Sequence, residues 1–235
     1  MNPDNLPLAL IPGFMLDETL WDAFVAEFPP SRTFVRASLR EGETIAEMAR
    51  HIVSTLPPRF VLVGFSLGGY IARSIVEQFP QSVAGLVLVA TSLREDSEEQ
   101  QQIKTAAIKA VSGPTFRGIS TGAIAATLHP SRAQDHALIA QIRAMGAQLG
   151  ADVFRRQASL VRGKITRHPI ECPTLVIAAA DDPSRPLAEL QELHQSIAGS
   201  TLALIEQCGH MVPLEQPGRL AETISEWLAK QRESW

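Results

Sequence analysis

Three short segments of the chain carry side chains that could together perform nucleophilic catalysis. Ser66 lies in Gly-Phe-Ser-Leu-Gly, residues 64–68, between an apolar run and a stretch of helical spacing. The pair Asp181 and Asp182, and later His210, each follow another apolar run. Because a serine hydroxyl is a weak nucleophile at neutral pH, it needs a histidine to accept its proton and usually an acid to orient that histidine. We therefore expect Ser66 to be a nucleophile on a tight strand-to-helix turn, where glycines let the two elements approach closely.

Of the six histidines, His210 is the one placed to serve as the base. It lies in Cys-Gly-His-Met-Val-Pro, residues 208–213, immediately after the last predicted strand. A glycine-containing loop at that point could turn the imidazole toward the centre of a sheet. The other histidines fall in predicted helices or in the alanine-rich middle of the chain, where surface or packing roles are expected. They are His51, His129, His136, His168 and His194.

The orienting acid has more than one candidate in the residues alone. Asp181 and Asp182 are adjacent in Ala-Asp-Asp-Pro, residues 180–183, after the penultimate apolar run. Glu95 and Asp96 follow an earlier run and could serve instead. The residue pattern by itself leaves the acid open between these two sites.

Six apolar runs that alternate with amphipathic stretches are predicted to be strands. The strongest runs are apolar at successive positions rather than at alternate ones, which is typical of strands covered by helices on both faces. The sequence therefore predicts a mostly parallel sheet of about six strands flanked by helices. The predicted strands are residues 7–11, 33–37, 60–63, 86–90, 174–180 and 201–205.

Residues 93–170 interrupt the alternation of strand and helix. They are rich in alanine, glutamine and arginine, and they show helical patterns without a convincing strand. We interpret residues 93–170 as a helical cap inserted before the penultimate strand, and residues 1–92 and 171–235 as the core of the fold. The helices predicted in the cap are residues 98–110, 119–128, 135–148 and 152–162.

The order Ser66, Asp182, His210 along the chain resembles the α/β-hydrolase family. The resemblance covers nearly the whole chain and points to the branch with a serine nucleophile, which includes small bacterial carboxylesterases, cofactor-free haloperoxidases and enol-lactonases. In these proteins the acid stands just before a proline-containing turn, a position that Asp182 matches, and Asp181 is then a loop-stabilising neighbour. The family's N-terminal hairpin is expected to be absent, because the first predicted strand begins at residue 7.

The same resemblance implies an oxyanion hole built from two backbone N–H groups. They belong to Leu67, directly after the nucleophile, and to Phe14, in the loop after the first predicted strand. That loop reads Ile-Pro-Gly-Phe-Met-Leu-Asp, residues 11–17, and has Pro12 where the family carries a histidine. A simple strand-to-helix turn in which Asp17 caps the next helix fits the same residues.

The residues and the resemblance together predict a serine hydrolase that cleaves a small carboxylic ester or lactone through an acyl-enzyme. The resemblance implies a small-molecule substrate with an acyl group, and neither a cofactor nor a metal. The same residues could instead serve thioester or carbon–carbon bond hydrolysis, acyl transfer or perhydrolysis, since these reactions share one fold. A non-catalytic ligand-binding protein on the hydrolase fold is an alternative of another class.

Large apolar residues of the cap could line the substrate pocket. At helical spacing, however, such residues belong more often to a core than to a binding site. The candidates are Phe116, Met145 and Phe154.

Composition argues against several other function classes. The 235 residues are 45% apolar and 20% charged, which suits one soluble domain with a substantial core. A formal net charge of −4 argues against nucleic-acid or anionic-membrane partners, because such a chain gains little from counterion release or from a basic patch. The apolar stretches are short and no signal-type segment begins the chain, so cytoplasmic residence is expected. Cys172 and Cys208 fit no zinc spacing and are expected to remain free thiols.

Overall fold

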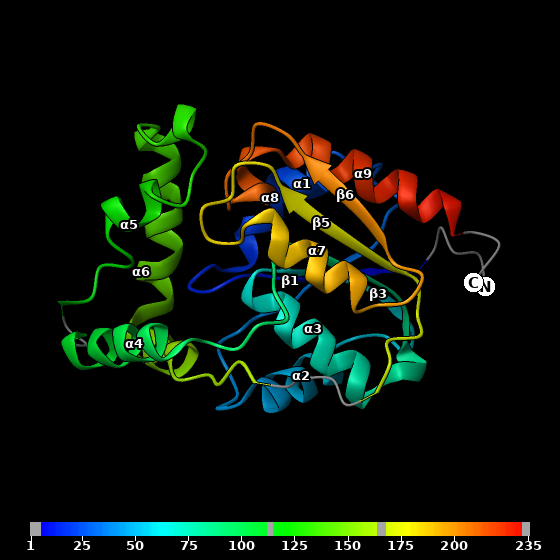
Figure 1. Ribbon diagram of the computed structural model, residues 1–235, viewed down its shortest axis with the longest axis horizontal. Coiled ribbons are helices and arrows are strands. Elements are labelled where there is room, and N and C mark those ends of the chain that lie inside the picture. Colours follow the sequence, from blue (N-terminus) through cyan, green and yellow to red (C-terminus); the bar gives the residue numbers. More distant parts are fainter. Residues whose placement is uncertain (1–5, 112–114, 164–167, 232–235) are drawn as a thin grey trace.

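The fold is built on one parallel sheet of six strands. The structure, a computed structural model, describes residues 6–111, 115–163 and 168–231. Neighbouring strands pair in parallel in the order β2-β1-β3-β4-β5-β6, which confirms the predicted parallel α/β architecture (Figure 1). The strands are β1 Leu8–Ile11, β2 Phe34–Arg36, β3 Phe60–Phe65, β4 Val83–Val89, β5 Thr174–Ala179 and β6 Thr201–Ile205.

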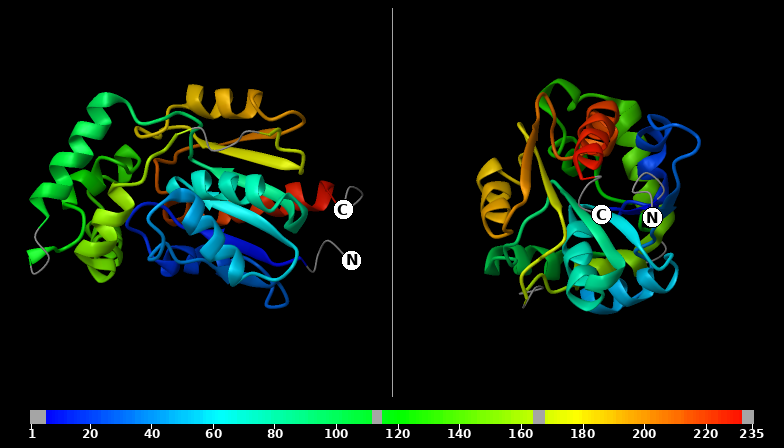
Figure 2. Two further views of the ribbon diagram at one scale, coloured as in Figure 1. Left: turned by 90° about the horizontal axis from the view of Figure 1, so that it is seen from below. Right: turned by 90° about the vertical axis from the view of Figure 1, so that its right-hand side faces the viewer.

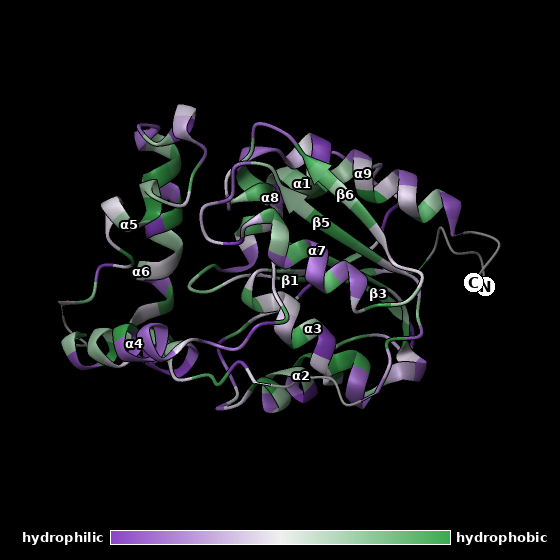
Figure 3. Cartoon of the chain, viewed as in Figure 1, coloured by the Kyte–Doolittle hydropathy of each residue, from purple (hydrophilic) through white to green (hydrophobic). Residues whose placement is uncertain are grey.

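Helices cover both faces of the sheet, which explains why the central strands are apolar at successive positions. Leu62 and Leu88 pack into the core on one face, whereas Val63 and Val87 pack into the core on the other. Figure 2 shows the two helical layers, and Figure 3 shows the hydrophobic strands between them. Each fully buried Val or Leu side chain contributes about 1.5–3 kcal/mol. The first face carries α2 (Ile45–Ser54), α3 (Leu67–Gln78) and α7 (Leu187–Gln195); the second carries η2 (Glu18–Trp21), α1 (Asp22–Ala26), α8 (Val212–Glu215) and α9 (Pro217–Lys230).

The described part of the chain between β4 and β5 contains helices joined by loops, and these helices lie together beside the sheet (Figure 1). Residues 98–110 form a helix with the predicted bounds. The helices predicted at 135–148 and 152–162 meet at Gly150, whose φ of 83° and ψ of 175° interrupt the helical backbone, and the second ends earlier than predicted, at Ala158. The extent of the cap, residues 93–170, stays a prediction. The helices are α4 (Glu98–Ala110), α5 (Thr121–Ala125), η5 (Pro130–Arg132) and α6 (His136–Ala158).

Parallel strands place all their carboxyl ends at the same edge of the sheet, so the loops that follow β1, β3, β5 and β6 converge there. These four loops contain the candidate residues Phe14, Ser66, Asp182 and His210. The topology thus brings together segments that are far apart in the sequence.

Two further features of the described residues are the state of the cysteines and the character of the helices. Both cysteines are free thiols. Burial raises the pKa of Cys172 to about 11, and burial also raises the pKa of the fully buried Cys208. Among the helices of the described ranges, none combines the length and the apolar character that crossing a bilayer requires.

Candidate active site

Ser66 stands between β3 and α3 on the turn that the glycine pattern predicted. Its φ of 52° and ψ of −113° lie outside the regions that serine normally adopts. The Ser66 N–H donates to the Val89 carbonyl of β4 at 2.9 Å, and the Thr91 hydroxyl donates to the Ser66 carbonyl at 2.7 Å. Because a strained residue persists only where its surroundings fix it, these two bonds help to hold the serine on the turn.

The glycines on either side of Ser66 allow backbone segments to approach unusually closely. A Cβ atom on Gly64 would lie 2.6 Å from the carbonyl oxygen of Gly68. A Cβ atom on Gly68 would lie 2.4 Å from the carbonyl oxygen of Ile11, at the end of β1. Glycine is therefore required here for space, and the turn packs directly against the start of the loop that contains Phe14.

Gly68→Ala is expected to destabilise the fold, because the backbone oxygens in the way cannot move aside as a flexible side chain can. Overpacking of this kind lowers the free energy of unfolding by about 1–3 kcal/mol. For a chain of this size each kcal/mol lowers Tm by roughly 2–4 °C, which thermal unfolding followed by circular dichroism measures. Gly122→Ala in α5 is the matched control, since nothing lies within 4 Å of a Cβ atom there. Equal Tm values for the two variants would contradict the steric explanation.

His210 bridges Ser66 and Asp182 through its two ring nitrogens. Nε2 lies 3.0 Å from the Ser66 hydroxyl oxygen, and Nδ1 lies 2.8 Å from Oδ2 of Asp182. An ionised carboxylate can only accept, so Nδ1–H donates to Asp182 and Nε2 is left to accept from the Ser66 hydroxyl. The Asp182 side chain is fully buried and that of His210 is 8% exposed, so little water competes for these bonds.

The structure also separates the candidate acids. The other oxygen of Asp182, Oδ1, accepts from the backbone N–H groups of Ser184 at 2.8 Å and Arg185 at 2.9 Å, which fixes the carboxylate. The neighbouring Asp181 is half exposed and lies 3.6 Å from Nε2 of His129. Of the two aspartates, Asp182 is the one hydrogen-bonded to His210.

Asp96, the alternative from the β4 loop, lies in another environment. Its carboxylate pairs with Lys104 of α4 and lies 3.8 Å from the guanidinium of Arg162. Burial lowers the pKa of Lys104, and the neighbouring Arg162 lowers it further, whereas the contact with Asp96 acts in the opposite direction. The geometry therefore gives Asp96 the role of a local counter-ion.

Glu215 supports the loop that carries His210, and sequence reasoning missed it. This buried carboxylate accepts from the N–H of Met211 at 3.0 Å and from the N–H of His129 at 2.8 Å. The His210 N–H itself donates to the Thr127 carbonyl at 2.7 Å. The residues just after α5 and the histidine loop are thus held as one unit. The sequence offered no signal for this, because it depends on a contact between distant segments.

The loop between β1 and η2 borders the same space as Ser66. Phe14, Met15 and Leu16 line one cavity together with Ser66 and His210. Leu67, which carries the second predicted oxyanion donor, is the first residue of α3. Asp17 accepts from the Thr19 N–H at 2.9 Å and caps η2, as the helix-capping alternative predicted. The same loop can therefore both begin a helix and lie beside the nucleophile.

The cavity at Ser66 has a volume of about 250 Å³ and an almost entirely apolar wall. Side chains from α5, α6 and the segment before α5 close it, and no Lys, Arg, Asp or Glu is among its described lining residues. The predicted pocket residues Phe116, Met145 and Phe154 do not line it; Phe154 packs edge-on against Phe14, with ring centroids 5.6 Å apart. The lining residues are Phe14, Met15, Leu16, Phe65, Ser66, Ile119, Ala123, Ile124, Thr127, Ile142, Ser184, His210 and Met211.

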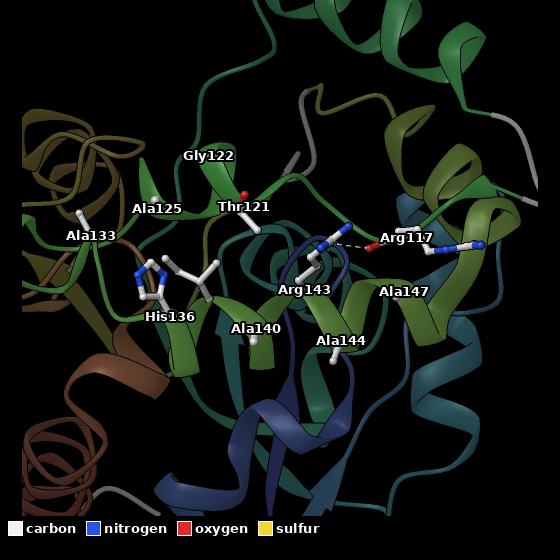
Figure 4. Close-up of a pocket in the computed structure, with 11 residues that line it drawn as sticks. Arg117, Thr121, Gly122, Ala125, Ala133, His136, Ala140, Arg143, Ala144 and Ala147 are labelled. Atoms are coloured by element: carbon white, nitrogen blue, oxygen red, sulfur yellow. Dashed lines mark hydrogen bonds between the residues drawn. The ribbon is translucent and has the colours of Figure 1, made fainter.

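A larger hollow of about 610 Å³ lies between α5 and α6 (Figure 4). Alanines form much of its wall, and Nε of Arg143 donates to the Arg117 carbonyl at 3.1 Å. It shares no described lining residue with the cavity at Ser66. Size alone would favour this hollow as a substrate site, but the hydrogen-bonded serine borders the smaller cavity.

Comparisons with known proteins concern the chain as a whole. The family model described as "Alpha/beta hydrolase family" matches residues 8–223. Among curated proteins, a pimeloyl-[acyl-carrier protein] methyl ester esterase of Yersinia pseudotuberculosis is 21% identical over 229 residues, covering 94% of this chain and 80% of the relative.

Solved structures that are similar to the chain include an esterase and an enol-lactonase. A thermophilic esterase from Thermogutta terrifontis is 27% identical with a TM-score of 0.76, covering 96% of this chain and 90% of that one. The enol-lactonase from Burkholderia xenovorans LB400 has a TM-score of 0.83 at 18% identity, covering 96% of this chain and 92% of that one. At that identity the second similarity concerns the fold alone.

Proposed function

The chain belongs to the alpha/beta hydrolase family, and from this membership we propose that it is a serine hydrolase that cleaves a small, uncharged carboxylic ester or lactone. The observation that carries the proposal is the hydrogen-bonded line from Ser66 through His210 to Asp182. The similarity to named esterases over most of the chain supports ester chemistry.

In the proposed mechanism His210 accepts the hydroxyl proton while Oγ of Ser66 attacks the carbonyl carbon. Asp182 stabilises the imidazolium through Nδ1. The backbone N–H groups of Phe14 and Leu67 donate to the oxyanion of the tetrahedral intermediate, and the positive end of the α3 dipole adds to their effect. Collapse of the intermediate expels the alcohol oxygen, which takes the proton from His210. Water, deprotonated by His210, then attacks the acyl carbon; the bond to Oγ of Ser66 breaks, the acid is released, and His210 returns the proton to Oγ.

The lining of the cavity supports an uncharged substrate. A charged group in this apolar space would lose its hydration without gaining a charged partner, because the described lining residues contain no Lys, Arg, Asp or Glu. An apolar acyl or alcohol group next to the reacting carbonyl would instead replace water along Ile119, Ile124 and Ile142. The proposal therefore includes selection by the size of this group.

Ala123→Leu is expected to lower kcat/KM for a hexanoate ester relative to an acetate ester by roughly tenfold or more, the effect of about one misfitting methylene group in an apolar pocket. Ala123 lines the cavity, so a larger side chain at this position is expected to reduce the space for the longer acyl group. Initial rates with a graded series of p-nitrophenyl esters measure the ratio. Ala140→Leu, in the hollow that does not reach Ser66, is the matched control. A change of similar size in both variants would count against this cavity as the substrate site.

Covalent trapping tests the proposed function itself. The purified protein is treated with a fluorophosphonate, and the modified residue is located by mass spectrometry in wild type, Ser66→Ala and His210→Ala. The expected result is a single adduct on Ser66 that is absent from Ser66→Ala and strongly diminished in His210→Ala. A folded wild-type protein that forms no adduct and hydrolyses no ester would favour the ligand-binding alternative.

A further inference from the structure

Gln157 is a fully buried amide in α6 that joins two loops at the carboxyl edge of the sheet. Its Oε1 accepts from the backbone N–H of Met15 at 2.8 Å, in the loop after β1. Its Nε2 donates to the backbone carbonyl of Leu39 at 3.0 Å, beyond the end of β2. Both polar atoms of the side chain are thus used, and both partners belong to segments more than a hundred residues away.

Met15, the residue that Gln157 contacts, has an unusual backbone conformation. It has a φ of 54°, which is uncommon for a residue with a side chain, and it is 1% exposed. A residue in this region remains there only where surrounding contacts hold it. The hydrogen bond that the Met15 N–H donates to Gln157 is one such contact, and the packing of the Met15 side chain with Leu149, Val153 and Phe154 of α6 is another.

The amide of Met15 directly follows the residue whose N–H is proposed as an oxyanion donor. The peptide unit between Phe14 and Met15 carries the N–H that Gln157 holds, so rotation of that unit would also change the backbone of Phe14. Phe14 and Met15 both line the cavity at Ser66. Fixing the amide of Met15 therefore limits the directions available to the preceding amide, that of Phe14.

The end of α6 that carries Gln157 is itself held in place. Arg156 donates to the backbone carbonyl of Arg40 and pairs with Glu43 at 2.9 Å. The end of α6 is thus attached to the loop after β2 through two consecutive side chains, which holds the Gln157 amide in place relative to the sheet.

We propose that Gln157 is a positioning residue for the reaction: by holding Met15, it directs the N–H of Phe14 toward the oxyanion that forms on substrate bound at Ser66. The inference rests on the proposed function. It assigns to α6 a part in stabilising the transition state, in addition to closing the substrate cavity.

The test compares Gln157→Leu, which removes both hydrogen bonds at similar volume, with Gln78→Leu. Gln78 also bridges two elements, since its side chain donates to the Ala46 carbonyl of α2 from α3, but it lies away from Ser66 and its lining residues. Gln157→Glu is the conservative variant, because its carboxyl oxygen can still accept from the Met15 N–H. Thermal unfolding of each variant separates loss of stability from loss of rate.

We expect Gln157→Leu to lower kcat by roughly 10- to 100-fold, less than the loss of a whole oxyanion donor, with KM nearly unchanged. Affinity for a trifluoromethyl ketone, which forms a tetrahedral oxyanion with the active serine, should fall in parallel with kcat/KM. Gln157→Glu should recover part of both losses, and Gln78→Leu should show neither.

Three results would overturn the inference. One is a Gln157→Leu variant as active as a Gln78→Leu variant of equal stability. Another is a loss of kcat without any loss of affinity for the trifluoromethyl ketone, since that would place the effect outside oxyanion stabilisation. The third is a wild-type protein that neither labels at Ser66 nor turns over any ester, which removes the proposed function as well. Only this last result affects both proposals.

Discussion

Replacing Ser66 with alanine is expected to lower kcat toward p-nitrophenyl butyrate by on the order of 10⁶-fold, as in other enzymes that lose a serine nucleophile. The hydroxyl oxygen lies 3.0 Å from Nε2 of His210, and without it no acyl-enzyme can form. The residual rate would come from substrate binding and from the proposed oxyanion donors, about 10³–10⁴-fold above the reaction in water. Steady-state hydrolysis and the loss of a pre-steady-state burst both measure the effect.

His210→Ala is expected to cause a loss of similar size, and the double variant is expected to fall hardly further, because residues that act as a unit are not additive. His136→Ala is the control, since that histidine is exposed at the start of α6. Losses that multiply in the double variant would mean that Ser66 and His210 act independently, in conflict with their hydrogen bond.

Asp182→Asn is the second large effect, with an expected fall in kcat of about 10⁴-fold. An asparagine amide at the position of Oδ2, 2.8 Å from Nδ1, can donate to that nitrogen. The imidazole would then carry its proton on Nε2, which could no longer accept the proton of Ser66. Little change in the binding of an uncharged product is expected, because the carboxylate does not line the cavity.

Two matched variants test which carboxylate orients His210. Asp181→Asn alters a half-exposed carboxylate one residue away, and Asp96→Asn alters the counter-ion of Lys104. Both are expected to retain most of the activity in the same ester assay. A severe loss in Asp96→Asn beside an unaffected Asp182→Asn would show that the carboxylate after β4 orients the histidine.

The strands were predictable because each one is a short apolar run with a polar or glycine-containing boundary. The main difference lies in β4, which begins at Val83 rather than at residue 86. Ala84 and Gly85 have weak strand preference; Val83 and Gly85 are paired with Phe60 and Val61 of β3, and Ala84 lies at the register shift between these two pairs. Local sequence could not show that contribution. In α6, by contrast, the gap between the predicted helices 135–148 and 152–162 contains the observed break at Gly150, since glycine readily accepts these backbone angles.

The candidate site was predictable where a residue's place follows from the end of a strand. Ser66, Asp182 and His210 all lie in loops at the carboxyl edge, so the order of strands brought them together. The pocket was not predictable, because periodicity defines the apolar face of a helix but not which neighbour that face meets. Phe116 and Phe154 accordingly pack against each other, whereas Ile124 and Ile142 line the cavity at Ser66.

The backbone conformation at Ser66 places the stability of the fold in conflict with the proposed activity. A non-glycine residue in such a conformation costs about 1–3 kcal/mol, whereas glycine would adopt a φ of 52° with little penalty. Serine is therefore the less stable choice at the one position where the proposed chemistry cannot do without it. Directed evolution of this protein for heat resistance alone would be expected to discard the side chain. Any such selection must screen for turnover in every round, and natural selection on this turn faces the same conflict.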